Sequence, residues 1–318
     1  MQSVNKINLP LVLISQIQRS GGTLLSQLFD GHSECCVHPE ELHIGYPRKE
    51  IWPIIQEESS CLYNFDILRE EIFSKLSRDG YKKSVKSIKM SDRIPFLFLG
   101  DKQNKVFEDL YSEVIVKSKR DIFNIYFTSF FNAWEDDRNR GGDKRIVLGF
   151  VPRMSMLEKS MEGFYNVYPD GKLISIIREP FGWYSSVRKY YGRYKSIKYA
   201  EAKYKSNIMS IINNKKRFKD NMFILDFKDL ILHTEIIMKE LCCFLGLTFE
   251  NIMFSPTFNK QNIMANSSYS IKEFGISKAP ISKRRKYKIK NKEDRQRIDH
   301  SWTPLYLKVC KCKNPLNY

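Results

Sequence analysis

The segment 11–28, LVLISQIQRSGGTLLSQL, restricts the possible folds of this chain more than any other stretch. An apolar run with β-branched residues passes directly into a turn with two adjacent glycines, and leucines then recur at helical spacing. The pattern predicts a strand, a tight loop and a helix. Gly21 and Gly22 allow the backbone to bend sharply or to approach a ligand closely.

This loop has the properties of an anion-binding site. The first N–H groups of a helix have no acceptor within the helix, and the helix dipole adds positive potential there. Arg19 places a guanidinium at the rim, which favours a phosphate-like or sulfate-like group. The N–H groups that would face this group belong to Ser20, Gly21, Gly22, Thr23 and Leu24. The plain structural alternative is a turn capped by Ser20.

Nucleoside-triphosphatase loops have the spacing GxxxxGK[ST], with a lysine that reaches the β- and γ-phosphates. Neither the spacing nor the lysine occurs here, which argues against an ATPase.

The composition fits one large domain. The chain has 318 residues, of which 42% are hydrophobic and 13% aromatic, enough for a sizeable core. We expect a single domain over 1–318, with a helical insertion at about 50–140 whose aromatic residues recur at helical spacing and form core. The lysine-rich stretch 81–89 either lines a groove or forms a solvated face. The formal net charge of +17 favours acidic partners: nucleic acid, an anionic membrane surface or a polyanionic small ligand.

No stretch has the length of a membrane span or the pattern of a signal peptide, so we expect a cytoplasmic protein. The seven cysteines are odd in number and lack CxxC spacing. They therefore suggest neither a disulfide framework nor a zinc site.

Strands and helices alternate along the rest of the chain. Apolar runs predict strands at 35–37, 145–151, 172–177 and 222–227, and amphipathic patterns predict helices at 154–167, 183–191, 200–218 and 234–245. Near-continuous apolar strands between helices are typical of a buried parallel sheet. We therefore predict the α/β class: a central parallel sheet of about four to five strands flanked by helices, with a P-loop-like first unit.

Two of these strands deliver an arginine at their carboxyl end. The run 145–151 is followed by Pro152 and Arg153, and the run 172–177 by Arg178. The carboxyl ends of parallel strands meet at one edge, where ligands bind. We therefore predict Arg19, Arg153 and Arg178 on one rim. A lone arginine there is more often a structural ion-pair partner, but three beside a backbone anion site indicate a ligand with more than one anionic group.

The segment HPEELHIGYP follows the predicted strand 35–37. Its prolines favour a loop, and loops at strand ends carry much of the chemistry of α/β sheets. His38, Glu40, Glu41 and His43 are therefore candidates for a general base. The alternative is a solvated loop without a catalytic role.

Four segments resemble the sulfotransferase family, enzymes that move a sulfuryl group from 3′-phosphoadenosine 5′-phosphosulfate (PAPS) to a hydroxyl or amine. QRSGGTLL is similar to the family's 5′-phosphosulfate loop, typically PRSGTTLL, with departures at Gln18 and Gly22. KLISIIREPFGWYSSVRKYY resembles the 3′-phosphate motif, an arginine at a strand end and a serine eight residues later, here Arg178 and Ser186.

The other two segments lie further along the chain. FILDFKDL resembles the family's YEDL segment near the adenine, with Phe227 in place of the usual tyrosine. PTFNKQNIMANSSYS resembles a loop that closes over the nucleotide in some sulfotransferases, and its matching residues are Asn266, Ser267 and Ser268. The insertion at 50–140 is the part that the resemblance covers least.

The resemblance implies how PAPS, or its product 3′-phosphoadenosine 5′-phosphate (PAP), would be held without a metal. Arg19 and the loop amides would bind the 5′-phosphosulfate, and Arg178 and Ser186 the 3′-phosphate. Ser267 and Ser268 would assist.

The resemblance also implies a catalytic set. The base in many members is a glutamate after the second strand, which favours Glu41, with Glu40 as an alternative. Cytosolic members use a histidine, so His38 and His43 stay open. Arg153 would lie near the bridging oxygen.

The function that follows is sulfuryl transfer from PAPS to a hydroxyl of a saccharide or other small alcohol, with no nucleic-acid partner. Three alternatives stay open: a nucleotide-dependent kinase, a nucleic-acid binder that uses the basic run 283–292, and a nucleotide-binding protein without catalysis. The resemblance to sulfotransferases would instead place Arg284 or Arg285 of that run near the 3′-phosphate. Neither the acceptor nor the oligomeric state follows from the sequence.

Overall fold

A five-stranded parallel sheet organises the computed structural model, which describes residues 6–81, 93–115, 117–264, 274–281 and 289–314. Its spatial order is β2-β3-β1-β4-β5, and every pairing is parallel. The strands are β1 (Leu11–Ile14), β2 (Cys35–Glu41), β3 (Ile146–Phe150), β4 (Lys172–Ile177) and β5 (Met222–Asp226). The predicted α/β class with a parallel sheet is confirmed.

Both faces of the sheet are buried, which explains why its strands are apolar throughout rather than alternating. Successive residues of a strand point to opposite faces. Leu11 and Leu13 therefore belong to one hydrophobic core, and Val12 and Ile14 to the other.

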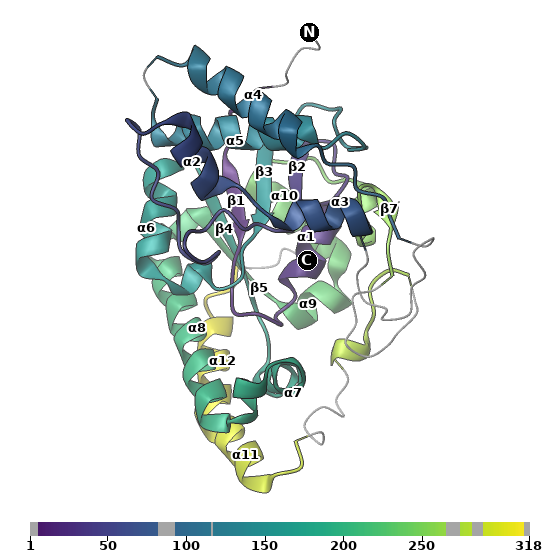
Figure 1. Cartoon of the computed structure of the whole chain (residues 1–318). Helices are drawn as coiled ribbons and strands as arrows, with labels where there is room; N and C mark the ends of the chain where they lie inside the picture. The colour runs from purple at the N-terminus through teal and green to yellow at the C-terminus, as the bar shows by residue number, and fades with distance from the viewer. Residues whose placement is uncertain (1–5, 82–92, 116, 265–273, 282–288, 315–318) are drawn as a thin grey trace.

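Helices cover the two faces (Figure 1). Side chains of α5, α6, α8 and α12 pack in the core on one face, and those of α1, α9 and α10 in the core on the other. The helices are α1 (Gly22–Phe29), α6 (Glu158–Val167), α7 (Pro180–Tyr190), α8 (Ile197–Phe218), α9 (Phe227–Leu232), α10 (Thr234–Leu245), α11 (Lys292–Arg297) and α12 (Thr303–Cys310).

Four further helices lie between β2 and β3: α2 (Cys61–Leu68), α3 (Ile72–Asp79), α4 (Gly100–Glu113) and α5 (Lys119–Ala133). Figure 1 shows α4 and α5 at the top of the molecule, away from α7 and α11 at the bottom. Their aromatic residues are core, as predicted: Phe123, Phe127 and Phe130 are at most 1% exposed. Most of the lysine-rich stretch 81–89 lies outside the described residues.

The structure corrects the predicted loop at HPEELHIGYP. β2 does not end at residue 37 but continues to Glu41, so His38, Glu40 and Glu41 are strand residues. The pairing with β3 shifts register between Val37 and Glu41. β2 is an edge strand of the sheet, and a proline is tolerated there because one side of the strand needs no ladder hydrogen bonds.

The C-terminal helices were not predicted at all. α11 reads KEDRQR, a charged segment without apolar periodicity. A π-helical turn, Ile298–Trp302, follows it and buries Trp302 completely. Ile298 and Val309 are buried in the same core, whereas α11 itself buries none of its residues.

Candidate active site

The loop after β1 is held at three successive residues. The N–H of Ile17 donates to Asn207 Oδ1 (2.8 Å), and Trp183 Nε1 donates to the carbonyl oxygen of Gln18 (3.0 Å). Arg178 Nη1 donates to the carbonyl oxygen of Arg19 (2.6 Å). These partners come from α8, α7 and the residue after β4, so the packed helices fix the loop in position.

The loop enters α1 through an unusual backbone. Arg19 has φ 67° and Gly21 has φ 109°, both in the left-handed region that favours glycine. Gly21 caps α1 without a side-chain hydrogen bond, and the N–H of Leu25 makes the first bond back to its carbonyl (3.1 Å). The preceding N–H groups have no acceptor within the helix.

Both glycines are required by close packing. A Cβ on Gly21 would lie 2.5 Å from the ring of Phe227, and one on Gly22 would lie 2.2 Å from the ring of Phe150. Gly22 is one of the departures from the family loop, and Phe150 at the end of β3 explains it.

Arg19 and Arg178 come together from turns 159 residues apart in the chain. Besides its bond to the Arg19 carbonyl, Arg178 places its guanidinium carbon 4.4 Å from the ring centroid of Phe227. Arg19 Nε donates to Ser186 Oγ (3.2 Å), and its guanidinium carbon lies 4.3 Å from the ring centroid of Tyr190. Aromatic contacts of this kind hold a guanidinium at a fixed position.

Arg19, Arg178, Ser186 and Phe227 line one cavity of about 150 Å³, which we call the strand-end cavity. Its lining includes the predicted residues Arg19, Gly21, Gly22, Thr23, Leu24, Glu41, Arg178, Ser186 and Phe227. Ser20 is buried beneath the loop rather than in the lining (2% exposed). Asn266, Ser267 and Ser268 fall in 265–273, outside the described residues.

Among the base candidates, Glu41 is the one that lines the strand-end cavity. Its Oε2 forms an ion pair with Lys49 Nζ, which orients the carboxylate. Lys49 lies only eight residues after Glu41, but no motif in the sequence indicates this ion pair.

His38 does not face this cavity. It is completely buried, with its ring 5.3 Å and 5.1 Å from the rings of Phe73 and Phe130. Nε2 bonds Glu70 Oε1 and Nδ1 bonds the carbonyl oxygen of Glu40, both at 3.0 Å. Burial alone would lower the pKa of His38, but the charge and hydrogen bond of Glu70 raise it. Both ring nitrogens are engaged, so His38 is a structural residue.

Glu70 is a buried carboxylate that organises the surroundings of His38, and the sequence patterns did not identify it. It is buried and also accepts hydrogen bonds from the N–H of His43 and from Tyr126 Oη (2.8 Å). Burial lowers the pKa of His43. Glu70 lies 32 residues from His38, and no motif connects them in the sequence.

Arg153 follows β3 at the same edge of the sheet as Arg19 and Arg178, but it does not line the strand-end cavity. Arg153 Nη2 forms an ion pair with Glu50 Oε2 (3.2 Å), and the residue lines a neighbouring cavity of about 340 Å³. We call it the basic cavity; it is lined by Ile17, Gln18, Arg48, Glu50, Arg153, Met156, Leu157, Arg193, Tyr194, Tyr199 and Lys203. Gln18 lines both cavities.

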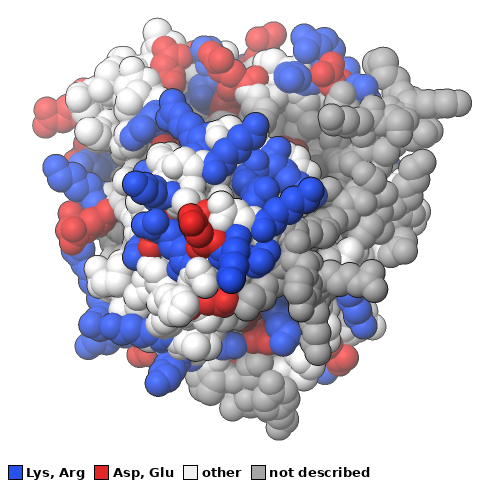
Figure 2. Space-filling view, turned by 90° about the horizontal axis from the view of Figure 1, so that it is seen from below, with Lys and Arg blue, Asp and Glu red and all other residues white. Residues whose placement is uncertain are grey.

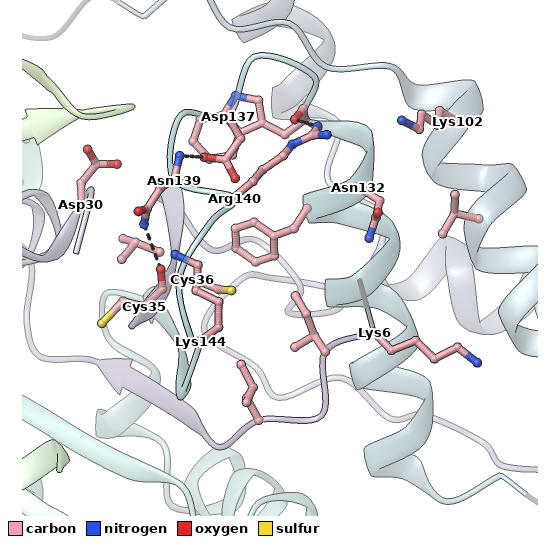
Figure 3. A pocket seen from close by; sticks show the side chains of 17 residues that line it. Lys6, Asp30, Cys35, Cys36, Lys102, Asn132, Asp137, Asn139, Arg140 and Lys144 are labelled. Carbon is pink, nitrogen blue, oxygen red and sulfur yellow. Dashed lines mark hydrogen bonds between the residues drawn. The ribbon is translucent and has the colours of Figure 1, made fainter. Parts of the chain in front are cut away.

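A cavity of about 930 Å³ opens at the opposite edge of the sheet, where the strands begin (Figure 3). Its charged groups already bond protein groups: Lys102 pairs with Glu135, and Lys144 donates to the carbonyl oxygen of Ser33 (2.8 Å). Burial raises the pKa of the Cys36 thiol to about 12, which keeps it protonated and unreactive.

Within the described ranges, no cluster of His, Cys, Asp and Glu side chains could hold a metal ion. In the same ranges, no helix combines the length and the apolar character needed to cross a membrane.

Comparisons with known proteins support the architecture. No family model matches the sequence, and no curated protein matches it. Among the solved structures that match over nearly the full length are two sulfotransferase domains. The sulfotransferase domain of the Synechococcus PCC 7002 olefin synthase is 14% identical, with a TM-score of 0.58 over 95% of this chain and 97% of that one. The sulfotransferase domain of the curacin biosynthetic pathway is 16% identical, with a TM-score of 0.54 over 92% and 97%. This chain therefore has the fold of those sulfotransferase domains.

Proposed function

We propose that this protein is a PAPS-dependent sulfotransferase whose nucleotide binds in the strand-end cavity. The observation that carries the proposal is the meeting of Arg19 and Arg178, from two separate turns, at one cavity. Two guanidinium groups and a set of helix-terminal amides suit a ligand with two separate anionic groups. The shared fold of the two sulfotransferase domains supports the same conclusion.

We assign the two ends of the nucleotide from the resemblance of the two turns to the phosphate motifs of sulfotransferases. Arg19 and the N–H groups of Gly22, Thr23 and Leu24 hold the 5′-phosphosulfate, since they surround the start of α1. Arg178 and Ser186 hold the 3′-phosphate. Phe227 offers its ring to the adenine beside Arg178.

Catalysis then depends on positioned charge. When bound, the nucleotide supplies the sulfuryl group for transfer. Arg19 and the loop amides neutralise negative charge at the 5′ end, and one such preorganised donor is worth roughly 3 kcal/mol. Glu41 lines the same cavity and takes the proton of the acceptor hydroxyl, and Lys49 keeps its carboxylate in place.

Nucleotide binding is tested by comparing PAP with AMP, which lacks the 3′-phosphate. We expect PAP to raise the melting temperature and AMP to raise it much less. Arg178→Lys keeps the positive charge but loses the planar guanidinium that can donate two parallel hydrogen bonds to a phosphate. The preference of this variant for PAP over AMP should therefore fall by about tenfold or more. Arg188→Lys is the matched control, since Arg188 lies on α7 but does not line the cavity. Stabilisation by ATP or RNA and not by PAP would overturn the proposal.

The role of Glu41 is tested by transfer of labelled sulfate from PAPS. Glu41→Gln should lower kcat by about 10²–10⁴ and leave the PAP dissociation constant nearly unchanged. Glu40→Gln is the control, because Glu40 does not line the strand-end cavity. Full activity of Glu41→Gln would assign the base elsewhere.

A further inference from the structure

The basic cavity adjoins the strand-end cavity. Its walls come from the loop after β1, the segment after β2, the turn after β3, the short helix Gly192–Lys195 and the start of α8. Gln18 lines both cavities, and its Nε2 donates to Tyr194 Oη in the basic cavity. A molecule in the basic cavity would therefore lie beside the loop that we assign to the phosphosulfate.

The charges of this cavity are unbalanced. Arg48, Arg153, Arg193 and Lys203 line it with a single carboxylate, Glu50. Glu50 pairs with Arg153 at 3.2 Å and lies 3.8 Å from Arg48. Among the residues that the structure describes, Arg193 and Lys203 form no ion pair. Cations that share a cavity without counter-charges repel one another, and a bound anion relieves that repulsion.

Arg153 is held in place by a costly backbone conformation. Its φ of 73° lies in the left-handed region, and its N–H donates to the carbonyl oxygen of Gln16 (2.9 Å). Such conformations in a residue other than glycine cluster at ligand-binding sites. The turn thereby places the guanidinium in the wall of the basic cavity.

Two tyrosines complete the wall. The rings of Tyr194 and Tyr199 meet edge to face with centroids 5.1 Å apart, and Lys203 Nζ lies 5.7 Å from the Tyr199 centroid. Aromatic faces next to cations suit a ligand that has both a ring with C–H groups and a negative charge. Figure 2 shows lysine and arginine side chains gathered on the face seen from below, the end of the molecule where α7 and α11 lie.

We propose that the basic cavity binds the sulfuryl acceptor, and that the acceptor is a saccharide with a carboxylate or sulfate group. The role of the saccharide as the sulfuryl acceptor rests on the proposed function. The binding of an acidic saccharide in this cavity does not depend on it. The anionic group pairs with Arg48, Arg193 or Lys203, and the sugar ring packs against Tyr199.

The test compares 4-nitrophenyl β-D-glucuronide with 4-nitrophenyl β-D-glucoside. The two differ only at carbon 6 of the sugar, which is a carboxylate in the first and a hydroxymethyl group in the second. Calorimetry on the PAP-loaded protein should give a dissociation constant at least about tenfold lower for the glucuronide, and the preference should shrink as salt is added. Arg193→Gln and Lys203→Gln should each raise the dissociation constant of the glucuronide by roughly fivefold to tenfold. Lys198→Gln, an exposed change on α8 outside the cavity, is the matched control and should have no effect.

PAP affinity, measured separately for every variant, distinguishes the two proposals. Normal PAP binding with equal affinity for the two glycosides, or with no binding of either, overturns the acidic acceptor and leaves the nucleotide site intact. A glucuronide preference that Arg193→Gln removes, in a protein that does not bind PAP, supports the saccharide site and overturns the sulfotransferase.

Discussion

Gly22 has no room for a side chain, because a Cβ there would meet the Phe150 ring and the Gln16 amide at 2.2–2.4 Å. Both neighbours are buried at the sheet and cannot move freely. We expect Gly22→Ala to lower the free energy of unfolding by about 1–3 kcal/mol and to weaken PAP binding, because the start of α1 must shift. Urea unfolding and calorimetry measure the two effects.

Gly100 provides the control for this substitution. It is the first residue of α4, and a Cβ there would meet nothing within 4 Å. Gly100→Ala should be neutral or slightly stabilising. A Gly22→Ala variant as stable as Gly100→Ala would show that the loop tolerates a side chain against Phe150.

His38 makes stability depend on pH. Burial lowers the pKa of His38, but the charge and hydrogen bond of Glu70, together with the bond to the Glu40 carbonyl, raise it, so the net shift is upward from 6.5. A raised pKa contributes stability that is complete below the unfolded value and is lost as the pH rises through the folded value. We therefore expect the free energy of unfolding to fall as the pH increases above 6.5.

His38→Gln should be less stable at pH 6 and should lose most of this slope, which urea titrations at several pH values measure. The pKa of His43 is lowered by burial, so its own effect appears below pH 6.5 and does not mask the one above. A wild-type stability that stays level above that pH would contradict the pairing of His38 with Glu70.

The carboxylate of Glu201 joins two elements. It lies on α8 and accepts hydrogen bonds from Arg297 and Ser301 of the C-terminal region, and it pairs with Lys205. Burial would raise its pKa, but these hydrogen bonds lower it to about 2. A lowered pKa contributes stability above the unfolded value of 4.5 that is lost as the pH falls toward the folded value of about 2.

Glu201→Gln should cost roughly 1–3 kcal/mol at pH 7 and should reduce the loss of stability in acid, since its partners hold a charged group. Hydrogen exchange over α11 and α12 would rise. Glu235→Gln is the control, because Glu235 has a single exposed partner, Lys239, on its own helix. Equal effects of the two substitutions would rule out a special role for Glu201.

Elements with a strong pattern were predicted closely. The strand predicted at 172–177 is β4, residue for residue, and the helix predicted at 234–245 is α10. β2 was predicted too short because a proline and two glutamates interrupt its apolar pattern at the point where the edge strand becomes partly exposed.

At the scale of the whole molecule, strand order explains which residues meet. β4 pairs with β1, with Ile14 beside Ile174, so the turns that carry Arg19 and Arg178 are neighbours. β3 pairs with the other side of β1, and Arg153 therefore faces the basic cavity. Sequence patterns place all three arginines at the carboxyl edge but contain no information on the order of the strands along it.

By itself, the sequence determined the class of the fold, the glycine-containing loop at residues 19–24 and the strand-end positions of the arginines. These features are local, since periodicity, glycine placement and strand ends depend on neighbouring residues. Only the tertiary structure decided that Arg178 meets Arg19, that Glu41 faces the cavity with Lys49, and that Glu70 engages His38. Most of these pairings depend on packing between segments that are distant in the chain, and the pairing of Glu41 with Lys49 depends on how the chain turns after β2. No spacing in the sequence specifies them.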